Sequence, residues 1–302
     1  MSDHGKAMVF AAFVADSLAL GAHWIYDTEQ IRKRFGRVDR LLKPGSGSFH
    51  ATKEKGDFTH YGDQALVLLE SIAEKGTFDL EDFSSRWRAL FDGYTGYMDE
   101  ATRLTLSSYA SGKGAKEAGS PSNDLAGAAR AFPLVYRFYK EPDTMVEAAK
   151  AQTRMTHGDP LTVDSAEFFA GVLYRVLDGA SPVKALEEIS QQDYPNTPLM
   201  GWVEKGLQSK EGESVAAIAR FGQTCHTPDA LPGVVHLIAK YERDLREALV
   251  QSVMAGGDSA ARGMAVGMVL GAYLGMGSLP EEWLSDLNKG EYIADLLEKI
   301  AL

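Results

Sequence analysis

The sequence predicts an all-α protein, and three observations support this fold class. Segments of helix length, with apolar residues at helical spacing, follow one another along the whole chain. No convincing run of alternating apolar and polar residues predicts a strand, and the breaks between segments are short, with no low-complexity linker or repeat. We therefore expect one compact domain over residues 1–302, built from roughly a dozen helices.

The first predicted helix, residues 8–20, is apolar nearly all round and should be buried. Its Asp16 is either a cap or ion-pair partner in the core or an acid that faces a site. A signal peptide is the alternative for this apolar stretch. Only Lys6 is basic before it, Asp3 offsets that charge, and Asp16 interrupts the run. We therefore expect a cytoplasmic protein.

Predicted helices and polar loops alternate through the rest of the chain. Residues 45–61 and 111–122 are rich in glycine and polar residues without periodicity, which is typical of binding or flexible loops. The other predicted helices cover residues 62–75, 80–97, 99–110, 124–139, 144–155, 163–177, 182–189, 197–205, 214–220, 227–241, 244–255 and 280–302.

Glycines recur every fourth residue from Gly263 to Gly275, along one face of a helix. Each glycine inside a helix costs about 0.5–1 kcal/mol relative to alanine, so we expect another backbone to pack closely on this face. A membrane helix with a glycine dimerisation face is the alternative. Arg262, Pro280 and a mean hydropathy of -0.19 argue against it.

The segment before this helix places an acid at the helix start. Gly256 and Gly257 lead directly into Asp258. An aspartate there can cap the first turn, and the free N–H groups of a helix start favour anions.

The composition is that of a soluble globular protein, with 45% hydrophobic and 24% charged residues. The net charge of -11 argues against non-specific nucleic-acid binding but is compatible with a phosphate-bearing small molecule. Cys225 is the single cysteine, which excludes an internal disulfide and a cysteine-based zinc finger.

Polar residues form four clusters beside the apolar helices, at residues 16–27, at 50–63, at 122–130 together with 156–159, and at 258–259. Four of the seven histidines fall there: His23, His50, His60 and His157. A lone histidine is usually a satisfied polar group, but this clustering favours a functional role for at least one. No motif here has the strength of a zinc spacing or a phosphate-binding loop.

Four short motifs occur in a specific order: Ala15-Asp16-Ser17-Leu18-Ala19; Ser122-Asn123 through Ala129-Arg130 and Pro133; Thr156-His157 with Pro160; and Gly256-Gly257-Asp258-Ser259, followed by Pro280 and Trp283. In order and spacing the chain resembles the ADP-ribosylglycohydrolase family. That family shares its fold with dinitrogenase-reductase-activating glycohydrolase and a jellyfish lens crystallin. The resemblance spans nearly the whole chain. It implies an all-α fold and removal of ADP-ribose from modified side chains or related molecules, usually with two magnesium ions.

The positions that hold metal ligands in this family differ here. The family's Thr-Asp-Asp-Thr run aligns with Thr59, His60, Tyr61 and Gly62, so both aspartates are replaced. In the late motif Asp258 remains, but the next aspartate and the last threonine are replaced. Their positions are Ala260 and Ala261. The family's early glutamate falls near His23.

Three alternatives for the metal follow from these differences. Magnesium prefers oxygen ligands, and Thr59 with Asp258 provides too few carboxylates for two ions. The imidazoles of His23 and His60 favour a softer ion such as zinc or manganese. The centre is therefore a two-magnesium site, a single ion among Thr59, His60, Asp258 and His23, or free of metal.

Cleavage of a ribosyl bond passes through an oxocarbenium-like transition state. It needs a group that activates water and negative charge near the sugar. Asp16, Asp63 and Asp258 are the carboxylate candidates, and His60 is the candidate for proton transfer near neutral pH. N–H groups of the loop from Ser122 to Gly127, together with a cation, would hold phosphates. The predicted substrate-binding residues are Ser122, Asn123, Gly127, Arg130, His157, Tyr61 and Trp24.

Three hypotheses follow for the function. The first is a hydrolase acting on a small-molecule or ADP-ribosylated substrate through an altered, magnesium-independent centre. The second is a silent relative that binds ADP-ribose, and the third is a structural, crystallin-like protein. Loss of acidic ligand positions favours the second, whereas the density of histidine, aspartate and tyrosine around the same place favours the first. We prefer the first and expect neither a nucleic-acid nor a membrane partner.

Overall fold

The computed structural model describes residues 3–301, and in that range it contains α-helices and no β-strand. The extended contacts found there are two isolated bridges, Ser120 with His157 and Asp124 with His226. The predicted all-α fold class is confirmed.

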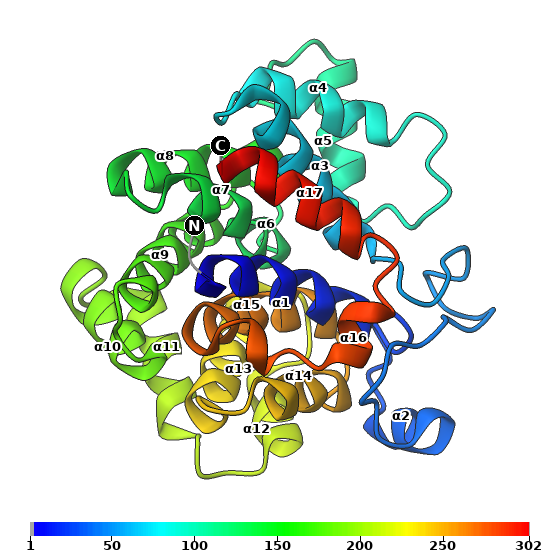
Figure 1. Ribbon diagram of the computed structural model, residues 1–302, viewed down its shortest axis with the longest axis vertical. Helices are drawn as coiled ribbons and strands as arrows, with labels where there is room; N and C mark the ends of the chain where they lie inside the picture. The colour runs from blue at the N-terminus through cyan, green and yellow to red at the C-terminus, as the bar shows by residue number, and fades with distance from the viewer. Residues whose placement is uncertain (1–2, 302) are drawn as a thin grey trace.

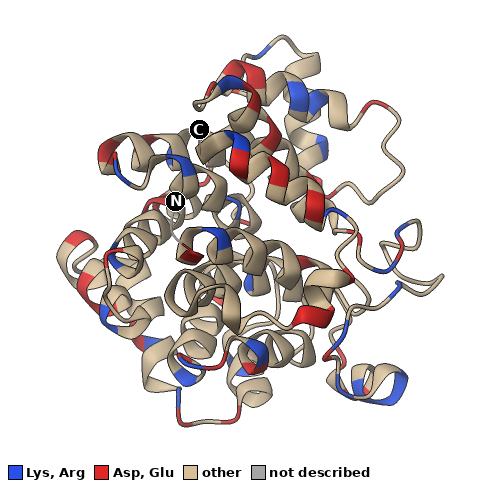
Figure 2. Ribbon diagram, in the orientation of Figure 1, with Lys and Arg blue, Asp and Glu red and all other residues tan. Residues whose placement is uncertain are grey.

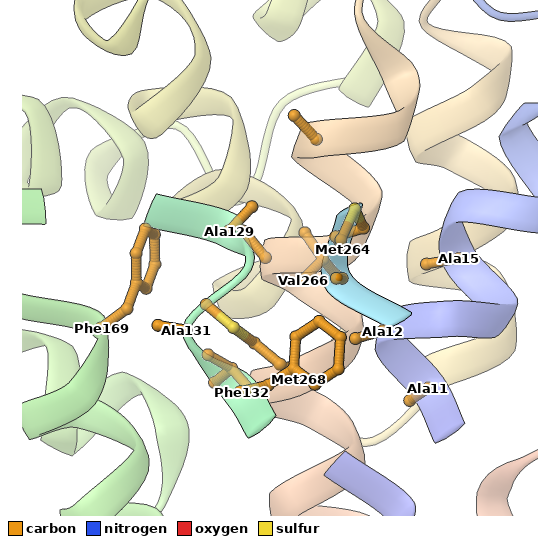
Figure 3. Packing of buried hydrophobic residues seen from close by; sticks show 14 of the residues in the cluster. Ala11, Ala12, Ala15, Ala129, Ala131, Phe132, Phe169, Met264, Val266 and Met268 are labelled. Carbon is orange, nitrogen blue, oxygen red and sulfur yellow. The ribbon is translucent and has the colours of Figure 1, made fainter. Parts of the chain in front are cut away.

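Two helices form the centre of the molecule, α1 (Asp3–Ala19) and α15 (Ser259–Leu274), and they lie side by side (Figure 1). A methyl group added at Gly267 would lie 2.5 Å from the carbonyl oxygen of Ala11, and one at Gly271 would lie 2.5 Å from that of Ala7. The predicted close backbone approach is therefore confirmed. Alanines of α1 face this interface, as Figure 3 shows for Ala11, Ala12 and Ala15.

The other helices surround this central pair (Figure 1). On one side lie α3 (His60–Lys75), α4 (Leu80–Leu90), α5 (Glu100–Ala110) and α17 (Gly290–Ala301). The rest are α2 (Thr28–Phe35), α6 (Ala126–Ala129), α7 (Phe132–Phe138), α8 (Pro142–Thr156), α9 (Pro160–Leu177), α10 (Pro182–Asp193), α11 (Pro198–Gln208), α12 (Ser214–Phe221), α13 (Thr227–Lys240), α14 (Leu245–Met254), η1 (Met276–Ser278) and α16 (Glu281–Ser285). Their apolar faces meet in a single buried cluster.

Three predicted helices are shorter or divided. The segment 124–139 breaks between α6 and α7, where Pro133 has no N–H to continue the helix. The segment 80–97 ends at Leu90, and Gly93 then takes a left-handed conformation. The segment 280–302 divides into α16 and α17 at a turn whose Asn288 N–H bonds to the carbonyl of Gly56.

Two further differences bear on the site. The helix α3 begins at His60, so His60 and Tyr61 belong to its first turn and not to the preceding loop. In addition, helix α2 is not predicted from the sequence. Asp27 caps this helix by accepting hydrogen bonds from two N–H groups, and the helix ends at Gly36. Only Ile31 of α2 is buried, so its apolar periodicity is too weak to detect.

Acidic and basic side chains are interspersed over the outer helices (Figure 2). Among residues 3–301, no helix has the length and apolar character needed to cross a membrane.

Candidate active site

A tyrosine hydroxyl lies between two buried carboxyl groups. The Tyr61 hydroxyl oxygen is 3.1 Å from Asp124 Oδ2 and 3.0 Å from Asp258 Oδ2. All three side chains are almost fully buried. The single proton of the hydroxyl serves one contact, so the second contact needs a proton on a carboxyl group. The arrangement is therefore a proton-sharing network.

Burial determines where this second proton resides. Burial raises the pKa of Asp124 well above its ordinary value, and the nearby charge of Asp258 raises it further. Burial also raises the pKa of Asp258, whereas the Ala261 N–H and Tyr61 lower it. Asp124 is thus the carboxyl group with the stronger tendency to hold the proton, and Asp258 is the one with the stronger tendency to ionise. Burial also raises the pKa of Tyr61 well above its usual value, so the phenol stays protonated.

The predicted catalytic residue Asp16 acts on α3, the helix that carries Tyr61. Its carboxyl group accepts hydrogen bonds from the Thr59 N–H at 2.7 Å and the Thr59 hydroxyl at 2.5 Å. Thr59 in turn caps α3 by accepting from the Tyr61 N–H. A methyl group at Gly62 would lie 2.5 Å from Asp16 Oδ2, so only glycine allows this approach. Asp16 and Thr59 are therefore occupied in fixing the start of α3.

Asp258 is the N-cap of α15 and accepts from the Ala261 N–H at 3.1 Å. The preceding Gly256 and Gly257 have φ of 70° and 66°, a conformation that favours glycine. Backbone hydrogen bonds of 2.9 Å join Gly257 to both Trp24 and Ile25. The segment after α1 and the start of α15 are thus fixed together.

Three buried imidazoles gather beside this network. The ring centroids of His23 and His50 are 5.3 Å apart, and those of His50 and His60 are 5.5 Å apart. His23 Nδ1 lies 3.9 Å from Asp258 Oδ1, and His60 Nε2 lies 3.3 Å from Asp99 Oδ2. Burial and the neighbouring imidazoles hold the pKa of His23 well below its usual value, and burial and His60 lower that of His50 to about 3. His23 and His50 are therefore neutral at physiological pH.

The predicted phosphate-binding loop uses most of its N–H groups internally. The Asp124 N–H bonds to the Ser122 hydroxyl, the Leu125 N–H to the Cys225 carbonyl and the Gly127 N–H to the Asp124 carbonyl. Asn123 Oδ1 lies 2.5 Å from His226 Nδ1. The loop is therefore well fixed, but few of its amides are free to bind a phosphate.

Arg130 and His157 are likewise engaged within the protein. The Arg130 guanidinium donates to Gln64 at 2.5 Å and to the Thr156 hydroxyl at 2.7 Å. His157 Nδ1 lies 2.8 Å from the same hydroxyl, and burial lowers the pKa of His157 to about 3. A methyl group at Gly127 would lie 2.7 Å from the His157 ring. Both side chains therefore make structural contacts close to the loop.

Asp63 does not face the carboxyl pair. Its carboxylate is 2.5 Å from Lys53 Nζ and 2.5 Å from the Tyr94 hydroxyl. Within residues 3–301 these two side chains are the hydrogen-bond partners of the Asp63 carboxylate. The structure therefore joins Tyr61, predicted as substrate-binding, to Asp258, predicted as catalytic, and brings His23, a predicted metal ligand, close to Asp258. Asp63, also predicted as catalytic, lies in a separate contact.

Asp124 and Cys225 are site residues that the sequence did not predict. The possible ligand atoms of Asp124, Cys225 and Asp258 all lie within 4.8 Å of one another, the one such group of three in the described part of the chain. Asp124 reads in the sequence as one of several helix-cap residues. Cys225 is partly exposed, so this end of the network reaches the surface. Their proximity to Asp258 arises only from folding.

The fold of this chain is that of a known class of helical protein. A solved structure described as an ADP-ribosylglycohydrolase-related protein complex superposes with a TM-score of 0.78 at 26% identity, covering 99% of this chain and 96% of that one. The family model for ADP-ribosylglycohydrolase matches residues 2–302. The chain belongs to the ADP-ribosylglycohydrolase family.

Two relatives illustrate the range of this family. Crystallin J1A of Tripedalia cystophora is 23% identical, with 99% of this chain and 96% of the relative covered. The ADP-ribosyl-[dinitrogen reductase] glycohydrolase of Rhodospirillum rubrum is 26% identical, with 95% and 92% covered.

The side chains here do not fit a two-magnesium centre. The oxygens of Asp258 already accept from the Ala261 N–H and the Tyr61 hydroxyl. Ala260 and Ala261 are buried and offer no side-chain donor. Cys225 is a soft ligand that magnesium does not prefer, and burial keeps its pKa above the usual value. Asp124, Cys225 and Asp258 could together hold one divalent ion only if Tyr61 gave up its two contacts.

Proposed function

We propose that this protein hydrolyses a ribosyl glycosidic bond, in an ADP-ribosylated or nucleoside-like substrate, without a metal ion. The observation that carries this proposal is the hydroxyl of Tyr61 between the carboxyl groups of Asp124 and Asp258. The pair supplies one carboxylate and one carboxylic acid, which are the two groups that glycoside hydrolysis requires. Membership of the glycohydrolase family supports the same reaction class.

Each group has a defined role in this reaction. The Asp258 carboxylate stabilises positive charge at ribose C1 and takes a proton from the attacking water. The bond from C1 to the leaving group breaks with its electron pair on the leaving group, which receives the proton of Asp124. Tyr61 then accepts the proton from Asp258 and donates its own to Asp124. One water is consumed, and the starting protonation state returns.

Asp16 and Thr59 act as positioning residues because they hold α3 and thereby the Tyr61 hydroxyl. The neutral imidazole of His23 is 3.9 Å from Asp258 and places an uncharged polar group beside the reacting bond. The Asp63 carboxylate has no place in this reaction, since Lys53 and Tyr94 hold it elsewhere.

A substrate panel tests the proposal. ADP-ribosyl-arginine, ADP-ribosyl-serine and small N-ribosides would be incubated with the protein in the presence of a chelator, and again with magnesium. We expect turnover of at least one substrate with the chelator present. We expect Asp258→Asn and Asp124→Asn each to lower kcat about a hundredfold or more.

Absence of turnover under every condition would overturn the proposal. If ADP-ribose then raised the melting temperature, the chain would be a binding protein. If ADP-ribose had no effect, a structural role like that named for the crystallin relative would remain. Turnover that needs magnesium would overturn the metal-independent centre while keeping the reaction class.

A further inference from the structure

A cavity lies next to the carboxyl pair, with His23 between them. It has a volume of about 320 Å³ and lies between the end of α1, α2 and the loop 45–49. This is the lower end of the range for small-molecule sites, enough for one small ring system. His23 is the shared wall, because it lines the cavity and also lies 3.9 Å from Asp258.

The charged side chain that lines the cavity is an exposed arginine without an ion-pair partner in the described chain. Arg34 lines the cavity, and no ion-pair partner of Arg34 is found within residues 3–301, whereas its neighbour Arg32 pairs with Glu29 at 2.7 Å. No aspartate or glutamate lines the cavity. The Ser46 hydroxyl adds a polar group on the loop side. A single guanidinium with two parallel N–H groups matches a monoanionic carboxylate.

Flat apolar surface lies beside this charge. Trp24 is half-buried and stacks on His23 with ring centroids 4.4 Å apart. Phe49 makes an edge contact with Trp24 at 5.2 Å, yet it is 56% exposed, which is unusual for a phenylalanine. An aromatic ring seated in the cavity would cover part of both side chains.

The backbone at Trp24 is strained in a way that fixes this surface. Its φ is +62°, a left-handed conformation that costs a non-glycine residue on the order of 1–3 kcal/mol. The Trp24 N–H bonds to the Gly257 carbonyl at 2.9 Å, next to the Asp258 cap. The indole is thus positioned by the same turn that positions the carboxylate.

His23 gives an independent indication of a ligand. Its side chain is fully buried, yet neither ring nitrogen has a hydrogen-bond partner in the described chain. Buried polar atoms are nearly always paired. A neutral imidazole aimed at the cavity wall has one donor and one acceptor to offer a bound molecule.

We infer that this cavity binds a flat aromatic ring that bears a carboxylate, at a site beside the reacting carboxyl pair and distinct from it. The carboxylate of Asp258 has one oxygen toward Tyr61 and Asp124 and the other toward His23. The cavity therefore lies on the His23 side of Asp258.

Tryptophan fluorescence tests the binding directly. The protein has four tryptophans, and the other three, Trp87, Trp202 and Trp283, are at most 9% exposed, so a ligand in the cavity would quench Trp24. Nicotinate and nicotinamide share one ring and differ in charge. We expect saturable quenching by nicotinate with a Kd about tenfold or more below that of nicotinamide.

Two kinds of variant measure separately how the carboxylate and the aromatic ring of the ligand contribute to binding. Arg34→Gln should weaken nicotinate binding to the level of nicotinamide, whereas Arg32→Gln, an exposed arginine of the same helix that is paired with Glu29, should leave it unchanged. Trp24→Leu should weaken binding of both probes, which is measured by titration calorimetry because this variant lacks the reporter indole. Equal affinity for the two probes, absence of binding, or insensitivity to Arg34→Gln would overturn the inference.

One more variant separates this inference from the proposed function. Asp258→Asn should retain nicotinate binding because Asp258 does not line the cavity. Nicotinate binding by the wild-type protein without turnover of any substrate would overturn the proposed function and leave the cavity assignment standing. Turnover without nicotinate binding would do the reverse.

Discussion

At the scale of single residues, the position of Tyr61 distinguishes this chain from the two-magnesium pattern that its family resemblance implies. The tyrosine stands in the alignment where an acidic ligand is expected, and its hydroxyl contacts the one retained late aspartate, Asp258. A neutral donor thus lies between the two carboxyl groups of Asp124 and Asp258.

Replacement of Tyr61 by phenylalanine tests this role. Tyr61→Phe leaves two buried carboxyl groups without the donor between them, which should lower the free energy of unfolding by about 1–3 kcal/mol. Added Mg²⁺ or Mn²⁺ should raise the melting temperature of the variant more than that of the wild type, because a cation can replace the lost donor. Thermal denaturation with and without metal measures both effects.

Tyr136→Phe is the matched control. Its hydroxyl is also buried, but it donates to the Leu297 carbonyl instead of to a carboxyl group. It should lose stability without gaining a response to metal. Equal metal responses in wild type and Tyr61→Phe would contradict the bridging role.

Asp16 makes a second prediction at this scale. Burial raises its pKa from 3.8 to about 7. The folded protein therefore holds a proton that the unfolded chain releases, and Asp16 lowers the free energy of unfolding as the pH rises from about 4 to about 7. Asp16→Asn should reduce the loss of stability between about pH 5 and about pH 8. Urea denaturation at both pH values measures this, and an unchanged loss in the variant would refute it.

At the scale of elements, the contact between α1 and α15 sets the position of the site. The carboxylate of Asp258 stands at the start of α15, and Trp24 follows α1 closely, so sliding one helix along the other would separate them. The glycines of α15 allow backbones to approach where side chains would normally keep them apart.

Two alanine substitutions on α15 should have opposite effects. Gly267→Ala places a methyl group 2.5 Å from the Ala11 carbonyl oxygen and should lower the free energy of unfolding by about 1–3 kcal/mol or more. At Gly263 the nearest atom is 3.5 Å away, an ordinary contact, so Gly263→Ala should be neutral or stabilise by up to about 1 kcal/mol. Chemical denaturation of both variants measures the difference, and similar losses would argue against the close approach.

At the scale of the whole molecule, one buried cluster joins helices from α1 to α17. This continuity supports the expectation of one domain over residues 1–302, since independent domains would each have a core of their own.

Calorimetry tests this expectation. We expect a single thermal transition whose calorimetric and van't Hoff enthalpies agree. Two resolved transitions, or a van't Hoff enthalpy well below the calorimetric one, would instead indicate separately folding parts.

The sequence by itself determined the class of the fold and two of its main features. Helical periodicity gave the order of most helices, because burial of one helical face is a local property of spacing. The glycine spacing in α15 indicated close backbone packing, and the apolar surroundings of Asp16 indicated a buried carboxyl group; the structure confirms both. The short polar helix α2 lacked such a signal.

Only the tertiary structure decided which side chains meet. Asp124 and Cys225 lie far from Asp258 in sequence, and nothing local distinguishes Asp124 from an ordinary cap residue. The start of α3, one residue earlier than Tyr61, determines that Tyr61 faces the carboxyl pair, whereas Asp63 points to Lys53. Such juxtapositions depend on how helices pack over distances that no local sequence pattern spans.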